Sequence, residues 1–386
     1  MVNKSSLTIM QLVPTMNSGG IERGTIEIAD ATVKEGFRSI VLTKGGVLES
    51  RLTKVGSKVI KLDIASKNPI TIWRNINKIV KIIKDEKVDI VHARSRVPAW
   101  SAYYACRKTK AKFLTTFHGV YSGTSLLKKK YNSIMTKADL VISISDFITK
   151  HMVDNYGVNP KKIRKIYRGV DLKLFDKKRV SIDQVVKYTS QWNVPEDKHI
   201  ILLPGRLSRW KGQEVLIEAL AQIKEENFFC LILGDRTKSP KFTQKLERLI
   251  DHHGLSDRIG IYDNVQDILN LYHISHLVIS TSTRPEAFGR VMIEAGAMGK
   301  IMIATNHGGA CETIIDERTG FLVEPNNPKL LASRIKKVIN LTKAKRALIK
   351  KAAVKHVNEN FSIDLMKGKT IEVYKELKKK RIKKTS

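Results

Sequence analysis

Cysteine and long apolar runs are both scarce in this chain of 386 residues. The three cysteines, Cys106, Cys230 and Cys311, lie far apart and form no Cys-x-x-Cys pair. This argues against a disulfide framework or a zinc site and fits a reducing cytosol. No stretch approaches the roughly 18–20 apolar residues of a membrane-spanning helix. The N-terminus lacks the long apolar region and cleavage site of a signal peptide. We therefore expect a cytoplasmic protein without a membrane span.

Aromatic residues make up only 6% of the chain, and several familiar site motifs are missing. A nucleic-acid-binding protein usually shows aromatic residues among basic ones, or a known recognition module. The sequence also lacks the Gly-x-Gly-x-x-Gly and P-loop phosphate motifs, the His-Glu-x-x-His zinc motif and the Gly-x-Ser-x-Gly nucleophile motif. These absences give no support to the functions that those motifs serve.

Positive charge, in contrast, is in large excess. Lysine and arginine number 70 against 37 acidic residues, which gives a formal net charge of +33. Such a charge calls for an anionic partner, which can be nucleic acid, an anionic membrane face or a phosphorylated substrate. The basic residues are spread over the whole chain. We therefore expect a positive electrostatic field over the surface and no single binding region, and we predict no nucleic-acid partner. The apolar fraction of 42% is enough to build a core.

Short β-branched apolar runs alternate with longer amphipathic stretches along the chain. This alternation predicts an α/β protein with two doubly wound, Rossmann-like domains, in which helices cover parallel strands and the domains face each other across a cleft. Ligands of such sheets bind outside the carboxyl ends of the strands, so residues there are the first site candidates. The predicted strands are 7–13, 39–43, 59–62, 89–92, 112–117, 140–144 and 163–167, then 200–203, 228–233, 259–262, 277–280, 301–305 and 320–323.

The alternation weakens over a polar stretch in the middle of the chain, which we interpret as the connection between the domains. The prediction is an N-terminal domain at 1–175, a linker at 176–198 and a C-terminal domain at 199–360. A basic helix at 361–386 follows, and it can cross back to the N-terminal domain.

The segment 284–295 carries the richest chemistry. Pro285 stands where a helix is expected to begin, so Glu286 and Glu294 should lie about 12 Å apart along one helix. The amino end of a helix favours a phosphate or a negatively charged transition state. Two carboxylates at this separation can bind hydroxyls at both ends of an elongated ligand. The alternative is that the first is only a helix-terminal charge and the second a solvated one.

Three segments together resemble a known family. GGIER at 19–23, GRLSRWKG at 205–212 and EAFGRVMIE at 286–294 are similar to the retaining family 4 glycosyltransferases with the GT-B fold. The resemblance covers nearly the whole chain, including RGVDLKLF at 168–175 and HGGACETI at 307–314. It implies transfer of a sugar from a nucleotide diphosphate sugar of the UDP or GDP type. The N-terminal domain would take the acceptor and the C-terminal domain the donor. More narrowly, HARSRVPAWSAYYA and TTFHG resemble bacterial enzymes of lipopolysaccharide core synthesis. The implied acceptor is a cell-envelope glycan or a lipid-linked molecule.

In the C-terminal domain the resemblance assigns Arg206 and Lys211 to the nucleotide diphosphate. They follow a predicted strand, where a pyrophosphate is expected, and an arginine fork and a lysine point charge both suit phosphate. The alternative is an ordinary surface pair on a basic protein. The stretch 233–238, Leu-Gly-Asp-Arg-Thr-Lys, departs from the glycine-rich sequence common in the family and leaves the donor's identity open.

The same resemblance assigns roles within the segment EAFGRVMIE. Glu286 is implied to contact the hydroxyls of the donor sugar and Glu294 those of the ribose. The backbone amides of Phe288 and Gly289 are implied to face the sugar and the phosphates.

In the N-terminal domain Gly19 and Gly20 match the loop that approaches the donor phosphate, where a side chain would block the backbone. A tight turn without a ligand is the alternative. His118 matches a histidine that contacts the donor sugar near the reacting centre, although a histidine at a strand end is also often structural. Arg94 and Arg96 would suit an anionic acceptor, or they are ordinary surface arginines.

The chain contains no Asp-x-Asp pair, which metal-dependent glycosyltransferases use to hold a cation against the pyrophosphate. We therefore expect neither a metal nor a cofactor beyond the donor. Arg206, Lys211 and the amino end of a helix would stabilise the departing diphosphate instead. The family retains the anomeric configuration, and the sequence shows no obvious carboxylate nucleophile, which favours attack on the face that the diphosphate leaves.

Two other functions remain open at this point. One is a basic, non-enzymatic protein that binds nucleic acid or an anionic membrane, and the other is a GT-B sugar-nucleotide epimerase. The C-terminal stretch 375–384 carries seven basic residues and one acid. It predicts peripheral, electrostatic binding to the anionic cytoplasmic face of an inner membrane, unless it is simply a solvated helical tail.

Overall fold

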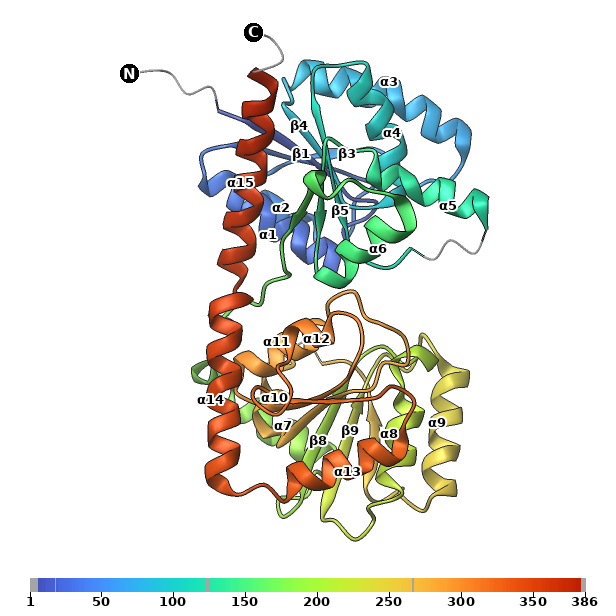
Figure 1. Ribbon diagram of the computed structural model, residues 1–386, viewed down its shortest axis with the longest axis vertical. Helices are drawn as coiled ribbons and strands as arrows, with labels where there is room; N and C mark the ends of the chain where they lie inside the picture. Colours follow the sequence, from blue (N-terminus) through green and yellow to red (C-terminus); the bar gives the residue numbers. More distant parts are fainter. Residues whose placement is uncertain (1–5, 18, 122–124, 266, 383–386) are drawn as a thin grey trace. The chain divides into compact units, whose positions relative to one another are not determined.

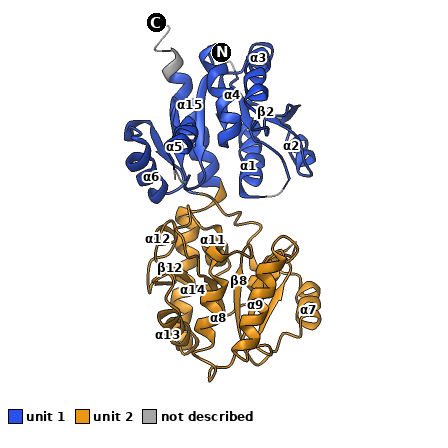
Figure 2. Ribbon diagram, turned by 90° about the vertical axis from the view of Figure 1, so that its right-hand side faces the viewer, with its two compact units in different colours: residues 1–167, 364–386 blue, residues 168–363 orange. Residues whose placement is uncertain are grey.

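The computed structural model describes residues 6–17, 19–121, 125–265 and 267–382. The chain divides into two compact units, and Figure 2 shows them in different colours. Unit 1 comprises Met1–Tyr167 and Asp364–Ser386, and unit 2 comprises Arg168–Ile363. The boundary between them therefore falls after Tyr167 rather than after residue 175.

Unit 1 is built on a sheet whose strands all run parallel (Figure 1). Among the described residues the strand order is β3-β2-β1-β4-β5-β6-β7. The order reverses between β1 and β4, so the loops that follow these strands flank the position where open α/β sheets bind ligands. The bounds are β1 (Thr8–Leu12), β2 (Arg38–Thr43), β3 (Lys58–Lys61), β4 (Ile90–Ala93), β5 (Lys112–Phe117), β6 (Leu140–Ser143) and β7 (Ile163–Lys165).

Helices connect these strands and cover the sheet on both faces, with α3 packed against α4 (Figure 1). Several begin with a side-chain cap, as where Ser145 accepts a hydrogen bond from the amide of Ile148 at the start of α6. The helices of unit 1 are α1 (Gly20–Lys34), α2 (Glu49–Lys54), α3 (Pro69–Asp85), α4 (Arg96–Arg107), α5 (Leu126–Asn132), α6 (Asp146–Tyr156) and α15 (Ile363–Ile382), with short 3₁₀ turns at Ser133–Thr136 and Pro160–Lys162.

The C-terminal helix α15 is part of unit 1, and polar contacts, one of them buried, join it to the sheet. The Tyr374 hydroxyl lies 2.8 Å from Nδ1 of His92 on β4, and Nε2 of that histidine lies 2.7 Å from Oγ1 of Thr116. On β7, at the edge of the same sheet, Arg164 makes two hydrogen bonds to the carboxylate of Glu376, at 2.8 and 2.5 Å. The predicted helix at 361–386 is described to Ile382, and residues 383–386 lie outside the described part.

Unit 2 has its own parallel sheet, in which the described strands follow the order β10-β9-β8-β11-β12-β13. Here the order reverses between β8 and β11. The carboxyl ends of these two strands are therefore the expected ligand edge of this unit. The bounds are β8 (His199–Pro204), β9 (Phe228–Leu233), β10 (Ile259–Tyr262), β11 (Leu277–Ser280), β12 (Ile301–Thr305) and β13 (Phe321–Val323).

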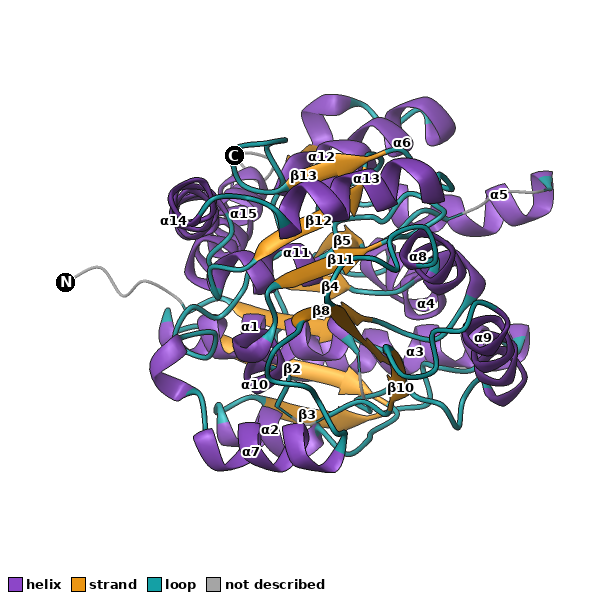
Figure 3. Cartoon of the chain, turned by 90° about the horizontal axis from the view of Figure 1, so that it is seen from below, coloured by secondary structure: helices purple, strands orange, loops and turns teal. Residues whose placement is uncertain are grey.

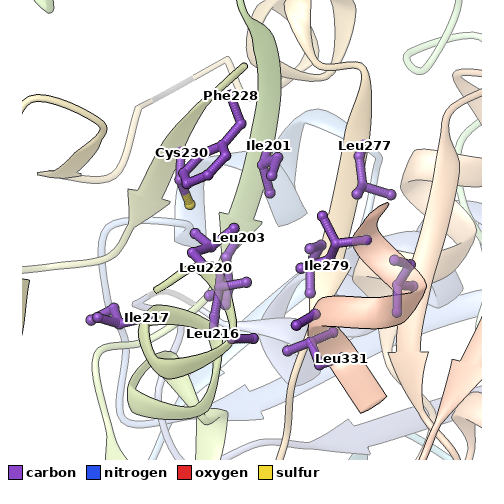
Figure 4. Packing of buried hydrophobic residues seen from close by; sticks show 14 of the residues in the cluster. Ile201, Leu203, Leu216, Ile217, Leu220, Phe228, Cys230, Leu277, Ile279 and Leu331 are labelled. Atoms are coloured by element: carbon purple, nitrogen blue, oxygen red, sulfur yellow. The ribbon is translucent and has the colours of Figure 1, made fainter. Parts of the chain in front are cut away.

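In unit 2, α8 and α9 cover one face of the sheet, and α10, α11 and α14 cover the other (Figure 3). Apolar side chains of β8 and β11, such as Ile201, Leu203 and Ile279, pack against Leu216 of α8 and Leu331 of α13 (Figure 4). The helices are α7 (Ile182–Gln191), α8 (Gln213–Leu220), α9 (Pro240–His252), α10 (Leu269–Ile274), α11 (Arg290–Ala297), α12 (Ala310–Thr313), α13 (Pro328–Ile339) and α14 (Lys343–Asn360), with 3₁₀ turns η3 (Lys177–Arg179) and η4 (Arg209–Lys211).

The stretch 176–198, which the sequence suggested as a linker, folds as part of unit 2. It forms helix α7, whose start is capped by the Ser181 side chain, and the ring of Trp192 then stacks on Tyr262 at 4.3 Å between centroids. This aromatic contact holds α7 against the edge strand β10. The polar composition suggested a linker because few of the residues in this stretch are apolar, although the stretch is folded.

The predicted α/β architecture with two Rossmann-like parallel sheets is confirmed, and several strands, such as β5 and β9, have the predicted bounds. One local prediction was wrong: α11 begins at Arg290 and not near Pro285. In the part of the chain that the structure describes, no helix is both long and apolar enough to cross a membrane.

Candidate functional site

Three loops meet at the carboxyl edge of the unit 2 sheet, after β8, β11 and β12. The Thr281 hydroxyl, just beyond β11, lies 2.8 Å from the carbonyl oxygen of Gly212 in the loop after β8. Gly212 has a φ of 71°, and a Cβ built on it would lie 1.9 Å from the Thr281 carbonyl oxygen. Only glycine fits there, because both the positive φ and the close approach exclude a side chain. The Thr305 hydroxyl, at the end of β12, donates a hydrogen bond to the carbonyl of Ser282 at 2.9 Å. This bond connects the loop after β12 to the loop after β11.

A half-buried ion pair lies at the centre of these loops. Nζ of Lys211 is 2.7 Å from Oε1 of Glu286, and the two side chains expose only 14% and 13% of their surface. The Ser282 hydroxyl donates to the same carboxylate oxygen. Burial opposes ionisation of Glu286, but the charge and hydrogen bond of Lys211, with help from Ser282 and His307, hold its pKa below the usual value. Glu286 is therefore an anion at neutral pH.

Arg206 and Lys211 both lie close to one aromatic ring, that of Trp210. The guanidinium of Arg206 is 5.8 Å from the ring centroid of Trp210, and the Lys211 ammonium is 4.9 Å from it. The Arg206 side chain is exposed, while its carbonyl accepts a hydrogen bond from Gln213 at 2.9 Å. The structure thus brings the two predicted diphosphate ligands together. Sequence reasoning did not single out Trp210, although it lies within the motif GRLSRWKG.

Glu286 is held in a loop and not at a helix terminus, which corrects the sequence interpretation. Its carbonyl accepts the amide of Gly309 at 2.8 Å, and a Cβ on Gly308 would come within 2.4 Å of that oxygen. This backbone pairing keeps the chain extended through Glu286, and Gly289, with a φ of 82°, turns it into α11. The estimate of 12 Å along one helix between the two glutamates therefore does not apply. The glycine pair of HGGACETI is explained by this contact.

Phe288 is buried, and its ring packs edge-on against Phe361 at 5.7 Å between centroids. Its side chain is thus part of the core, and only its backbone can serve the role that the resemblance implies. Gly289 forms the amino-terminal cap of α11.

Glu294 has partners different from those of Glu286. It lies on α11, where its carboxylate accepts a hydrogen bond from the Tyr272 hydroxyl at 3.1 Å and lies 3.4 Å from Nε of Arg290. Burial, followed by the Glu294 charge and hydrogen bond, raises the pKa of Tyr272 well above its usual value. Tyr272 therefore stays protonated and orients the carboxylate. Neither Tyr272 nor Arg290 was predicted as a site residue.

In the segment 233–238, whose sequence differs from the glycine-rich one common in the family, both basic side chains are paired with nearby carboxylates. Arg236 lies 2.9 Å from Glu247, and Lys238 lies 2.8 Å from Asp235. The hydrogen bonds from Lys238 and Thr237 lower the pKa of Asp235 to about 2. The added positive charge in this segment is therefore partly neutralised by its own neighbours.

In unit 1, Gly19 ends the loop after β1, and Gly20 is the first residue of α1. Gly19 has a φ of 146°, and a Cβ there would lie 2.6 Å from Oε2 of Glu22. The backbone conformation by itself thus favours glycine at this position. The loop after β2 packs closely against the loop after β1, because a Cβ on Gly46 would lie 2.5 Å from the carbonyl carbon of Met16.

His118 lies just after β5 with its side chain half-buried. Nearby Tyr121 forms a hydrogen bond with the backbone of His118, and burial raises the pKa of this tyrosine to about 12. The Arg96 guanidinium lies 4.4 Å from the Tyr121 ring centroid and donates to Oδ1 of Asn132 at 2.7 Å. His118 and Arg96 are therefore neighbours of the same aromatic residue.

Arg94 is not a surface arginine, contrary to either sequence interpretation. Its side chain is buried, and it donates to Oε1 of Gln11 at 3.1 Å, while Gln11 in turn bonds the carbonyl of Thr25 in α1. Burial lowers the pKa of Arg94, and the charges of Glu27 and Glu22 act against this. Arg94 thus helps to fix α1 on the sheet, which leaves Arg96 as the acceptor candidate.

The predicted site residues divide between the two units. Unit 2 holds the diphosphate candidates and both glutamates, whereas unit 1 holds Gly19, Gly20 and His118. Across the residues that the structure describes, no three His, Cys, Asp or Glu side chains are grouped so that they could hold a metal ion.

Two Rossmann-like parallel sheets, with charged and glycine-rich loops at their carboxyl edges, are the architecture of GT-B glycosyltransferases. The model of glycosyl transferases group 1 matches residues 186–355, and the model of glycosyltransferase family 4 matches residues 18–174. A glycosyltransferase from Rickettsia africae is 45% identical, with a TM-score of 0.90 over 97% of this chain and 99% of its own. The chain therefore belongs to the glycosyltransferases with the GT-B fold.

More distant relatives agree with this assignment. HepE from Anabaena, solved in complex with UDP, is 25% identical, with a TM-score of 0.84 over 96% of this chain and 100% of its own. An uncharacterised glycosyltransferase of Methanocaldococcus jannaschii is 24% identical over 92% of this chain and 94% of its own length. A glycosyltransferase is an enzyme, so the hypothesis of a non-enzymatic binding protein is not supported.

Proposed function

We propose that this chain is a retaining, metal-independent glycosyltransferase that moves a sugar from a UDP- or GDP-linked donor to a cell-envelope acceptor. The observation that best supports this is the cluster of Arg206, Trp210, Lys211 and Glu286 at the carboxyl edge of the unit 2 sheet. In it, two cations that would suit a diphosphate lie close to an ionised carboxylate that would suit sugar hydroxyls. The presence of UDP in the HepE structure favours a uridine donor among the two types.

The cations are suited to the leaving group. Arg206 is exposed and presents a planar fork of donors, and Lys211 has three donors, of which one reaches Glu286. As the bond between the anomeric carbon and the phosphate oxygen breaks, negative charge grows on the diphosphate. Fixed cations at that point stabilise the transition state more than the ground state.

Glu286 would accept hydrogen bonds from hydroxyls of the transferred sugar. Its lowered pKa keeps it ionised and therefore an acceptor at neutral pH. In the proposed front-face reaction, the acceptor oxygen attacks on the face that the diphosphate leaves, and its proton passes to the departing phosphate. Glu286 would then position the sugar through hydrogen bonds, without forming a covalent bond to it. On the family resemblance, His118 would contact the donor sugar and Glu294 would hold the ribose.

The same cluster supports metal independence, because Arg206 and Lys211 would take the role that a divalent cation has in other glycosyltransferases. We expect activity to survive EDTA. Loss of activity on chelation, with recovery on addition of magnesium or manganese, would overturn this part of the proposal.

The proposed acceptor is a lipopolysaccharide core sugar or another envelope glycan, which can be anionic. Arg96, the unburied arginine of the segment HARSRVPAWSAYYA, would meet that charge. A lipid-linked acceptor implies peripheral binding to the cytoplasmic face of the inner membrane. Helix α5 supports this, because Leu126 and Leu127 expose 86% and 81% of their surface next to Lys128, Lys129 and Lys130.

A donor screen tests the proposal directly. Thermal shift with UDP, GDP and ADP should identify the base, and mass measurement of the product made from the matching sugar nucleotides should give the transferred sugar. Transfer to an acceptor supports the proposal. Interconversion of free sugar nucleotides without transfer would favour the epimerase, and stabilisation by none of the three nucleotides would remove the donor site from unit 2.

A further inference from the structure

A groove of about 560 Å³ lies on unit 2, beside helix α14. It is bounded by that helix, by the 3₁₀ turn η3 and by Gly299. Four of its lining residues are lysines and one is an acid, Glu359. The four lysines are Lys177, Lys350, Lys351 and Lys355.

A fifth lysine, Lys300, is packed next to this groove. Its ammonium donates to the carbonyl of His273 at 2.7 Å, and a Cβ on the preceding Gly299 would lie 3.5 Å from Nζ of Lys177. Burial, followed by the charges of Lys350 and Lys177, lowers the pKa of Lys300 to about 8. Burial and the charges of Arg346 and Lys177 also lower the pKa of Lys350. The lysines therefore lie close enough to repel one another.

Carboxylates do not compensate for this concentration of charge. Within the described ranges, Lys177, Lys300, Lys350 and Lys351 have no acidic group within 4.0 Å, and Lys355 has Glu359 at 3.8 Å on the same helix. Other lysines of unit 2 are paired, as Lys336 is with Glu225 at 2.7 Å. Like charges held together without a counter-charge raise the energy of a fold, and a bound anion would lower it.

We propose that this lysine groove is a second anion site, which binds a phosphorylated ligand with two or more negative charges. Lysine ammonium groups act as point charges that can approach phosphate oxygens from several directions. The volume lies in the range of small-molecule sites. The chemistry fits a free di- or polyphosphate and equally the phosphate of an anionic lipid headgroup.

The groove is distinct from the candidate donor site. Gly299 and Lys300 directly precede β12, so they lie at the amino edge of the sheet, whereas the donor candidates follow the carboxyl ends of β8 and β11. A five-residue strand separates these edges by about 16 Å. The proposal therefore does not depend on the donor assignment, and the two can be tested separately.

Titration calorimetry with inorganic pyrophosphate, on the full chain at constant ionic strength, tests this site. The variant R206A/K211A serves as the background, so that the candidate donor site does not contribute. We expect K177Q/K350Q in that background to bind pyrophosphate at least tenfold more weakly. K345Q, which removes an exposed lysine of α14 outside the groove, is the matched control and should bind normally.

Sedimentation with vesicles of phosphatidylglycerol or phosphatidylcholine distinguishes the two ligand sources. Loss of pyrophosphate binding alone in K177Q/K350Q identifies a soluble phosphate ligand, and loss of phosphatidylglycerol binding identifies a headgroup. Nuclear magnetic resonance of labelled lysines gives a second measurement, because a bound anion should raise the pKa of Lys300. Unchanged binding of both probes in K177Q/K350Q, or an equal loss in K345Q, overturns the proposal.

Discussion

Lys211 and Glu286, which are 75 positions apart in the sequence, form an ion pair with 2.7 Å between Nζ and Oε1. The pair joins the loop after β8 to the loop after β11. The cation assigned to the diphosphate and the carboxylate assigned to the sugar are therefore one electrostatic unit. Loss of the Lys211 charge should raise the pKa of Glu286, and loss of Glu286 should leave the Lys211 ammonium without the partner that positions it.

The first prediction concerns diphosphate affinity. Arg206→Ala and Lys211→Ala should each weaken UDP or GDP binding by roughly tenfold or more, because a hydrogen bond to a charged group contributes about 1.5–3 kcal/mol. Calorimetry measures the affinity. Lys224→Ala, an exposed lysine near the opposite edge of the unit 2 sheet, serves as the control. Wild-type affinity in both site variants would remove these residues from the donor site.

The second prediction separates the two glutamates kinetically. Glu286→Ala should lower kcat in a folded protein, because the lost contact is to the sugar that is transferred. Glu294→Ala should mainly raise KM for the donor, since ribose contacts are alike in ground and transition states. Tyr272→Phe keeps the Glu294 carboxylate but removes its hydrogen bond, so it should raise KM for the donor by less than Glu294→Ala does. Wild-type kinetics in both glutamate variants would contradict the site assignment.

The third prediction concerns stability and pH. The folded pKa of Glu286 lies below its unfolded value of about 4.3. The unfolded chain therefore takes up this proton first as pH falls. The stabilisation from Glu286 is fully present above that pH and is lost as pH falls through the folded pKa.

Urea unfolding between pH 3 and 7 measures this effect. Relative to wild type, Glu286→Gln should flatten the acid limb of the stability curve. Lys211→Met should also flatten that limb, because without the charge and hydrogen bond of Lys211 the folded pKa of Glu286 rises toward its unfolded value. Identical acid limbs in all three proteins would show that the pair is not coupled in solution.

The fourth prediction concerns the contact between Tyr374 and His92. Tyr374→Phe should destabilise unit 1 by about 1–3 kcal/mol, because Nδ1 of the buried histidine loses its partner. Denaturant unfolding measures the change. Tyr104→Phe, at a site where the ring is 42% exposed, should change stability by no more than about 0.5 kcal/mol. Equal effects of the two substitutions would argue against the proposed anchoring of α15.

The fifth prediction concerns membrane binding. The chain should sediment with anionic but not with neutral liposomes, and high salt should release it. Deletion of residues 378–386 should weaken binding, although Lys383 and Lys384 lie outside the described residues. Lys375 is already paired with Glu35 at 2.5 Å, so Lys375→Gln should have a smaller effect.

Helix α5 gives a second test of membrane binding. L126S/L127S should also weaken binding to anionic liposomes, because two exposed apolar side chains can enter the headgroup region. Equal recovery of the wild-type chain on neutral and anionic liposomes would refute the electrostatic part of the prediction.

Local sequence patterns were enough to predict most regular elements. The bounds of β5, β9 and β12 follow from apolar runs and flanking polar residues, because both depend on neighbours close in the chain. The loops that carry the motif segments also lie at the ends of strands, as predicted.

Long-range contacts decided the rest. Helix α11 starts at Arg290 because the Glu286 carbonyl pairs with Gly309, and no local pattern encodes that partner. Arg94 is buried because Gln11 and α1 cover it, and α7 joins unit 2 because Trp192 stacks on Tyr262. The sequence by itself determined the two α/β sheets and the residue types at their carboxyl edges. Only the tertiary structure determined which charges meet, because an ion pair between loops depends on strands that are distant in sequence lying side by side in the sheet.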